Sequence, residues 1–353
     1  MRILWAFADV HERLNSSKWR IVIPSEALKR AGHKVELINM VQFDTGTHHF
    51  RPQDFDIVVA ERELFRNPER ILKWQEHIPV LASFDDAYHL IPESVVTSKV
   101  WRHGKVLKED GEQSPMITEF KKLLRKLDGY ITPSELLTSD FLTINPHGHT
   151  IPNYPDLSWD CWKAPRREPD GQVKMVWGGS LTHYDSWQYS GIVPALMRIF
   201  EEYDNVSLTL ITQDLRIRSL FAGIPPNKVR YHKGVEFEEW PRLLAQFDIG
   251  LAPLHGEYDR RRSWIKVLEY ALMGLLPLVT DVEPYQNTPA QLVRKPKADN
   301  WWKGLKIAID IFPSWAAQVC FDNRLWALAQ GIDDHIQEYI DVFNDAIERK
   351  QNG

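Results

Sequence analysis

The stretch that most constrains the fold runs from Asp248 to Thr280 and reads DIGLAPLHGEYDRRRSWIKVLEYALMGLLPLVT. Short apolar runs at its two ends predict buried strands, and the segment between them predicts a helix. A strand, a helix and a second strand in this order are typical of a parallel sheet, because parallel strands need a long crossover connection. The predicted helix is apolar nearly all round, so we expect it to be buried.

One charged stripe interrupts that helix. On a helical projection Lys266 lies about 40° and Glu269 about 20° from Arg262, so the three side chains share a face. Because charged side chains are seldom buried without partners, we expect the stripe to open onto water or a ligand cleft. Arg260, Arg261 and Arg262 precede or begin the helix. A diphosphate bound there would contact both their positive side chains and the helix N-terminus.

A carboxylate at Glu269 could accept hydrogen bonds from both hydroxyls of a ribose. The alternative is a surface stripe with a single ion pair three residues apart, which stabilises a helix by only about a few tenths of a kcal/mol. We favour a ligand, because the rest of the helix is apolar. The central hypothesis is therefore a cleft that binds a nucleotide diphosphate.

The first half of the chain alternates strands and helices. Five apolar runs predict strands at 2–8, 34–40, 54–61, 79–86 and 127–134, and a last strand is predicted to end at 149–153. Helices are predicted near 21–31, 68–76 and 115–126. Polar residues follow several of these runs, as is typical of parallel strands whose C-terminal ends carry a site. This half predicts one doubly wound α/β domain.

The alternation restarts after a segment rich in Pro, Trp and charge. Strands are predicted at 173–180, 206–213, 228–234, 248–254 and 275–281, and helices near 190–203, 238–246, 299–311 and 331–349. A chain of 353 residues exceeds the size at which one core keeps growing. We predict two Rossmann-like α/β domains of doubly wound parallel sheets that face each other across a cleft: 1–153, a linker 154–171, 172–330, and a helix 331–353 that packs back on the first domain.

Composition narrows the function. The net charge of −5 argues against a surface that attracts nucleic acid everywhere, and Cys161 and Cys320 offer neither a metal-ligand spacing nor a disulfide framework. The apolar run at the N-terminus is too short for a membrane span, so we expect a cytoplasmic protein. The chain has no HExxH, no legible Ser-His-Asp order, no P-loop lysine and no GxGxxG, which disfavours hydrolase, kinase and oxidoreductase functions.

A second candidate element is VWGGSLTH at 176–183. Gly178, Gly179 and Ser180 follow a predicted strand, where backbone without Cβ atoms could approach a phosphate and donate N–H groups. The alternative is an ordinary turn between a strand and a helix. The charged stripe at 262–269 favours the phosphate site.

Further candidates lie in SFDDAYHLIP at 83–92 and elsewhere. Asp85 and Asp86 directly follow an apolar strand, where paired carboxylates could raise one pKa and supply a base, or orient a sugar. The alternative is a turn with an aspartate cap. His183 could face the same cleft or be a structural hydrogen bonder, and Arg20 could reach the diphosphate or lie on a solvated helix face.

With these residues in view, the chain resembles the GT-B glycosyltransferases, and among them the glycosyltransferase family 4-like group. The segments that carry the resemblance are spread along the chain at 16–37, 83–92, 128–137, 150–153, 176–183, 247–254 and 263–285. The resemblance implies transfer of a sugar from a nucleotide-diphosphate donor to an acceptor bound mainly by the first domain, with retention of configuration and without a required metal.

By the same resemblance, Glu269 corresponds to the ribose-binding carboxylate, Lys266 and Arg262 to diphosphate contacts, and Gly179 and Ser180 to the glycine loop. Two positions depart from the family. Arg261 stands where a glutamate is common, and residues 178–187 contain no Arg or Lys.

We therefore expect a glycosyltransferase that uses a UDP- or GDP-sugar. The acceptor is open between a saccharide and a modified base in DNA, as in bacteriophage DNA glucosyltransferases, because basic stretches at 102–108, 121–126 and 165–167 lie near Trp101, Trp159 and Trp162. The alternative function is a non-catalytic two-domain protein that closes on a nucleotide or a sugar.

Overall fold

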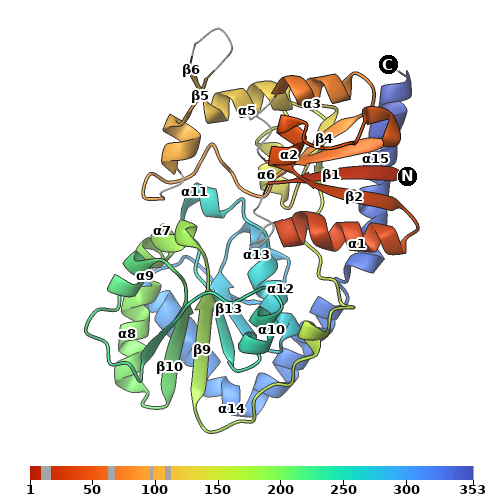
Figure 1. Ribbon diagram of the computed structural model, residues 1–353. Coiled ribbons are helices and arrows are strands. Elements are labelled where there is room, and N and C mark those ends of the chain that lie inside the picture. Colours follow the sequence, from red (N-terminus) through yellow and green to blue (C-terminus); the bar gives the residue numbers. More distant parts are fainter. Residues whose placement is uncertain (9–16, 63–67, 96–97, 108–112, 353) are drawn as a thin grey trace.

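The computed structural model describes residues 1–8, 17–62, 68–95, 98–107 and 113–352. The chain forms two parallel six-stranded sheets, each with helices on both faces, so the predicted fold class is confirmed (Figure 1). The first sheet has the strand order β2-β1-β3-β4-β7-β8. Its strands are β1 (Arg2–Phe7), β2 (Lys34–Asn39), β3 (Ile57–Glu61), β4 (Val80–Ser83), β7 (Gly129–Thr132) and β8 (Gly148–Thr150).

The second sheet has the order β11-β10-β9-β12-β13-β14. Its strands are β9 (Val173–Gly178), β10 (Val206–Ile211), β11 (Val229–His232), β12 (Ile249–Ala252), β13 (Leu276–Thr280) and β14 (Gln291–Val293). Every residue of β12 and β13 is buried, which explains why their sequences are continuous apolar runs rather than alternating ones. We call the units around these sheets the first and second domains.

Helices of the first domain are α1 (Ile23–Arg30), α2 (Met40–Thr45), α3 (Pro68–Gln75), α5 (Met116–Leu124) and α6 (Glu135–Ser139). Those of the second are α7 (Tyr184–Tyr189), α8 (Ile192–Glu202), α9 (Leu215–Ser219), α10 (Glu239–Leu244), α11 (Gly256–Asp259), α12 (Ile265–Leu272), α13 (Glu283–Gln286) and α14 (Ala298–Leu328). The last helix, α15 (Ile332–Asn352), follows α14 directly. The domain boundaries predicted at 153, 171 and 330 stay predictions.

Helix α15 packs on the first domain beside α1 (Figure 1). The ring of Trp5 in β1 lies 6.0 Å from that of Tyr339 and 6.1 Å from that of Phe343, measured between centroids. All three side chains are buried. One continuous hydrophobic cluster contains this face of the first sheet, α15 and the facing side of the second sheet with α12, so the two domains share part of their core.

The structure corrects several sequence predictions. Helix α12 begins at Ile265, so Arg262 lies in a turn before the helix and not on it. Helix α14 continues to Leu328 through Pro313, although a proline disfavours a helix interior, and its ends are held by buried residues such as Trp301, Leu305 and Ala327. The strand β14 and the hairpin of β5 (Lys105–Leu107) and β6 (Gln113–Pro115) were not predicted.

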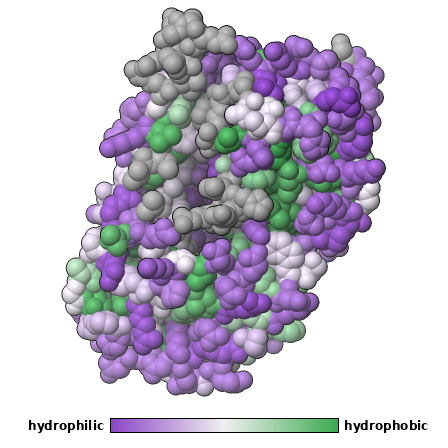
Figure 2. Space-filling view, viewed as in Figure 1, coloured by the Kyte–Doolittle hydropathy of each residue, from purple (hydrophilic) through white to green (hydrophobic). Residues whose placement is uncertain are grey.

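On the face shown in Figure 2, hydrophilic residues dominate and hydrophobic residues gather in limited areas. Cys161 and Cys320 are free thiols, and both are buried. Among the residues that the structure describes, no helix is long and apolar enough to cross a membrane.

Candidate functional site

The glycine loop, residues Gly178–Ser180, begins at the last residue of β9, at the C-terminal edge of the second sheet. A Cβ atom on Gly178 would lie 2.4 Å from the ring of Trp240, and one on Gly179 would lie 2.4 Å from the ring of Trp177. The backbone N–H of Gly179 donates to the carbonyl of Ile211 at 3.1 Å. The close approach of these two indole rings therefore requires glycine at both positions. The N–H of Gly179, predicted to donate to a phosphate, is instead hydrogen-bonded within the sheet.

Arg262 is held from two sides. Its Nε donates to Asp259 Oδ1 at 2.7 Å, and its Nη2 donates to Thr182 Oγ1 at 2.8 Å. The guanidinium carbon lies 4.7 Å from the centroid of the Tyr258 ring. Burial lowers the pKa of Arg262, but the neighbouring Tyr258, Asp259 and Asp86 together raise it by more than burial lowers it. The net shift of the pKa is upward, so the guanidinium stays charged.

Lys266 links helix α12 to the glycine loop, because its Nζ donates a hydrogen bond to the carbonyl of Gly178. The same Nζ lies 5.5 Å from the centroid of the Trp177 ring. Burial lowers the pKa of Lys266, while the neighbouring Glu269 acts in the opposite direction. The structure thus brings together the two elements that the sequence suggested separately, the glycine loop and the charged stripe.

Glu269 is only 7% exposed, so this end of the stripe does not open onto water, whereas Arg262 and Lys266 are half-buried. Burial raises the pKa of Glu269, and a hydrogen bond from Trp240 and the charge of Lys266 oppose that shift. A buried carboxylate beside a cation and an indole N–H can accept further hydrogen bonds from a ligand that displaces solvent from it. The role of Glu269 at a ribose stays a prediction.

The aspartates of the first domain follow β4 and are half-buried. Asp86 Oδ1 lies 3.9 Å from Nη1 of Arg262, so the two predicted halves of the site meet across the domain boundary. Asp85 lies next to Tyr88, whose pKa is raised by burial and by the charge of Asp85. The acidic edge of the first domain thus faces the basic edge of the second.

His183 lies in the turn after the glycine loop and is 5% exposed. Its pKa is lowered well below the ordinary value by burial and by the charges of Arg262 and Lys266, so the ring is neutral at pH 7. Its Nδ1 is buried without a hydrogen-bond partner among the described residues, and its ring contacts that of Trp177 edge-on at 5.5 Å. A neutral imidazole here suits hydrogen bonding better than acid catalysis.

Arg20, in the helical turn η2 (Lys18–Val22), is 1% exposed. Its Nη1 donates to the carbonyl of Ile151 at 2.7 Å and to Asn153 Oδ1 at 3.3 Å. Within the described part of the chain, no hydrogen bond or ion pair joins it to the other candidate residues. Its role at the diphosphate stays a prediction.

Sequence reasoning missed several residues that shape the site. Asp259 is 3% exposed and accepts hydrogen bonds from Arg262, from the backbone N–H of His255 at 2.9 Å and from Ser186 Oγ at 2.5 Å. Its spacing of three residues from Arg262 was a usable signal. The contacts of Tyr258 and Arg261 with the first domain had no signal in the sequence, because their partners lie far away in the chain.

Within the described residues, no group of three or more His, Cys, Asp or Glu has the arrangement of a metal site.

The sequence matches no protein-family model and no curated protein. Solved structures do match. HepE from Anabaena in complex with UDP-glucose is 12% identical with a TM-score of 0.65 and covers 97% of this chain and 99% of its own. A UDP-forming trehalose-phosphate synthase from Burkholderia xenovorans is 14% identical with a TM-score of 0.61, covering 84% and 75%. The catalytic domain of starch synthase IV from Arabidopsis thaliana, bound to ADP and acarbose, is 10% identical with a TM-score of 0.64, covering 98% and 99%. The protein therefore has the GT-B fold, as its sequence resemblance implied.

Proposed function

We propose that the protein is a glycosyltransferase that transfers a sugar from a UDP- or GDP-sugar to an acceptor held by the first domain, with retention of configuration. The observation that carries the proposal is the position of Arg262. Asp259 and Thr182 fix two of its nitrogens, and its Nη1 faces Asp86 of the other domain at 3.9 Å. Lys266 adds a second cation beside the glycine loop.

Each residue has a defined part in this proposal. Arg262 and Lys266 bind the diphosphate and stabilise the charge that develops on it as the bond to the sugar breaks, so a bound metal is not required. Glu269 accepts hydrogen bonds from the ribose. Asp85 or Asp86 orients the acceptor hydroxyl or removes its proton.

The complexes of the structural neighbours support the choice of donor class. HepE has been solved with UDP-glucose, and starch synthase IV with ADP and acarbose. Arg262 lies at the domain boundary and Lys266 beside the glycine loop, and a nucleotide diphosphate supplies anionic charge that both can bind. The sugar and the nucleotide base are left to experiment.

The test is a panel of nucleotide sugars and saccharide acceptors, with release of UDP or GDP as the readout. We expect one donor to be consumed, and we expect Glu269→Ala and Lys266→Ala to bind that donor much more weakly. Unchanged donor binding in both variants would show that the site assignment is wrong. Donor binding without release of a nucleoside diphosphate across the acceptor panel would favour the alternative, a non-catalytic binding protein.

We propose a saccharide acceptor rather than a DNA base. Trp101 and Trp162 are buried, so they cannot stack on a flipped base in this conformation. Arg166 and Arg167 both pair with Asp248, at 3.2 and 2.5 Å, and are engaged in holding the linker to the second sheet. Part of the basic stretch at 102–108 lies outside the described residues. Salt-sensitive retardation of duplex DNA in a gel would contradict the choice of a saccharide.

A further inference from the structure

The segment Gly256–Arg262, which we call the latch segment, belongs to the second domain but is anchored in the first. Tyr258 is 3% exposed and lies in the hydrophobic cluster on the outer face of the first sheet. Among the residues that the structure describes, all other members of that cluster come from the first domain. Ser134 Oγ, also of the first domain, donates a hydrogen bond to the carbonyl of Arg261 at 2.8 Å.

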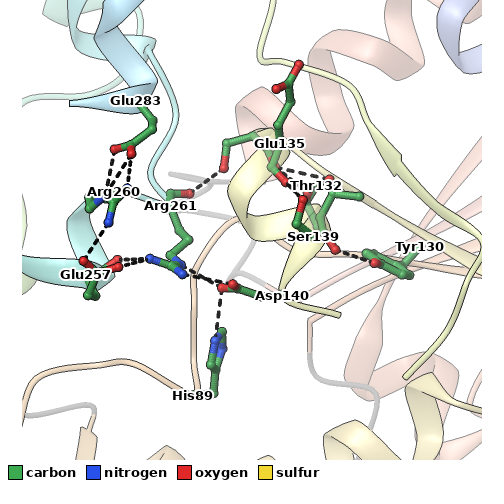
Figure 3. Close-up of polar contacts among 12 residues, drawn as sticks. His89, Tyr130, Thr132, Glu135, Ser139, Asp140, Glu257, Arg260, Arg261 and Glu283 are labelled. Atoms are coloured by element: carbon green, nitrogen blue, oxygen red, sulfur yellow. Dashed lines mark hydrogen bonds and ion pairs between the residues drawn. The ribbon is translucent and has the colours of Figure 1, made fainter. Parts of the chain in front are cut away.

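An ion pair strengthens this anchor. Arg261 Nε lies 2.7 Å from Asp140 Oδ2, and its Nη2 lies 3.0 Å from Asp140 Oδ1, so the guanidinium binds the carboxylate through two parallel contacts (Figure 3). His89 Nε2 lies 3.1 Å from the same Oδ2. Asp140 raises the pKa of Arg261, which keeps the charge in place despite burial.

Other polar contacts also cross the domain boundary, and two of them are exposed. Lys18 pairs with Glu238 at 2.8 Å, and the Glu238 side chain is 53% exposed. Arg216 donates to the carbonyl of Ser94 at 2.5 Å in an exposed contact. The side chains of Arg261 and Asp140 are only 14% and 15% exposed, so water screens their attraction less than that between Lys18 and Glu238.

The latch segment ends at the predicted diphosphate contact. Arg262 follows Arg261 directly, and its guanidinium is fixed to Asp259 of the same segment at 2.7 Å. Docking of Arg261 on Asp140 therefore also sets where Arg262 stands relative to Asp86. If the domains separated, Arg262 would move away from Asp86 together with the segment.

We propose that the latch segment holds the two domains closed, and that Asp140 and His89 are positioning residues which set Arg262 against the first domain. Arg261 stands where the resembling family commonly has a glutamate, and its charge is used for a contact between domains. The effect on donor binding rests on the proposed function, whereas the closure itself does not.

The first experiment uses the full chain without any nucleotide. We compare Arg261→Gln, Asp140→Asn and the double variant by small-angle X-ray scattering and by amide hydrogen exchange of residues 256–262. We expect a larger radius of gyration and about tenfold faster exchange in each variant. We expect no further opening in the double variant, because both substitutions remove the same ion pair between the domains, whereas the other partner of Arg261, Glu257, lies within the latch segment.

Arg260→Gln is the matched control. Arg260 carries the same charge one position earlier, but its partners, Glu257 and Glu283, both belong to the second domain (Figure 3). We expect this variant to remain as compact as the unmodified protein. Wild-type compactness and exchange in Arg261→Gln and Asp140→Asn would overturn the proposal, as would equal opening in Arg260→Gln.

The second experiment adds UDP and GDP. We expect the dissociation constant of whichever nucleotide binds to rise about fivefold in Asp140→Asn, which corresponds to about 1 kcal/mol, with a smaller rise in His89→Gln. An unchanged constant in a variant that has opened would overturn the link to Arg262. If no protein in the set binds a nucleotide while Asp140→Asn still opens, the latch is supported and the proposed function fails.

Discussion

Replacing Glu269 with glutamine tests the nucleotide site at a buried carboxylate. The substitution keeps the shape of the side chain and removes its charge, and the amide oxygen can still accept the hydrogen bond from Trp240. It also deprives Lys266 of a neighbouring carboxylate, so a simple loss of affinity would not identify what Glu269 touches. The measurement must therefore isolate the contribution that the ribose hydroxyl makes to binding.

A comparison of UDP with 2′-deoxy-UDP isolates it, with the guanosine pair used instead if GDP is the nucleotide that binds. A hydrogen bond to a charged acceptor contributes about 1.5–3 kcal/mol, and one to a neutral acceptor about 1 kcal/mol. With Glu269 intact, removing the 2′-hydroxyl should weaken binding roughly tenfold or more; with glutamine the factor should fall to roughly fivefold or less. The coupling between the substitution and the hydroxyl is then about 1 kcal/mol.

Isothermal titration calorimetry of the four combinations gives this coupling directly. Any change in Lys266 weakens both nucleotides equally and cancels in the ratio. Arg262→Gln is the companion variant, since it should weaken both nucleotides while leaving their ratio as in the unmodified protein. The same ratio of dissociation constants before and after Glu269→Gln would refute the assignment of Glu269 to the ribose.

Three further outcomes follow from the structure. Burial raises the pKa of Glu269, so nucleotide affinity should be full above that raised pKa and should fall as the pH drops through it. The fall should occur at a higher pH than for an exposed glutamate. Calorimetry at several pH values checks this, and an affinity that does not change with pH would contradict it. Gly250→Ala should lower the free energy of unfolding by about 1–3 kcal/mol in denaturant titrations, because the added Cβ would lie 2.3 Å from the Tyr270 ring. Gly234→Ala is the control: a Cβ there would have its nearest atom, in the side chain of Gln213, at 4.0 Å, so the free energy of unfolding should change little. Tyr258→Ala should cost about 3 kcal/mol of unfolding free energy, and a loss below about 1 kcal/mol would argue against its anchoring role.

Much of the fold could be predicted because buried parallel strands have a sequence pattern of their own. The runs that became β12 and β13 are continuously apolar and are separated by helices, and the same alternation in both halves of the chain implies two parallel sheets. The resemblance to GT-B glycosyltransferases rested on such segments, and the structural neighbours confirm the fold. The extension of α14 could not be predicted, because Pro313 lies inside it and tertiary packing overrides the local preference.

The site was less predictable, because its geometry depends on pairs that are distant in the chain. A single sequence contains no information that joins Arg261 to Asp140, 121 positions away. The glycine loop was interpreted as space for a phosphate, yet the same residue type is also required where an indole ring such as that of Trp240 approaches the backbone. The roles of the individual site residues stay predictions.

The return of α15 to the first domain has a consequence for how the protein is made. Trp5 leaves the ribosome well before Tyr339 and Phe343, the two residues against which it is buried. During synthesis the second domain can complete its sheet while the first still lacks a wall of its core. A fragment that ends near residue 153 should therefore aggregate, whereas the separately supplied α15 peptide should restore its solubility.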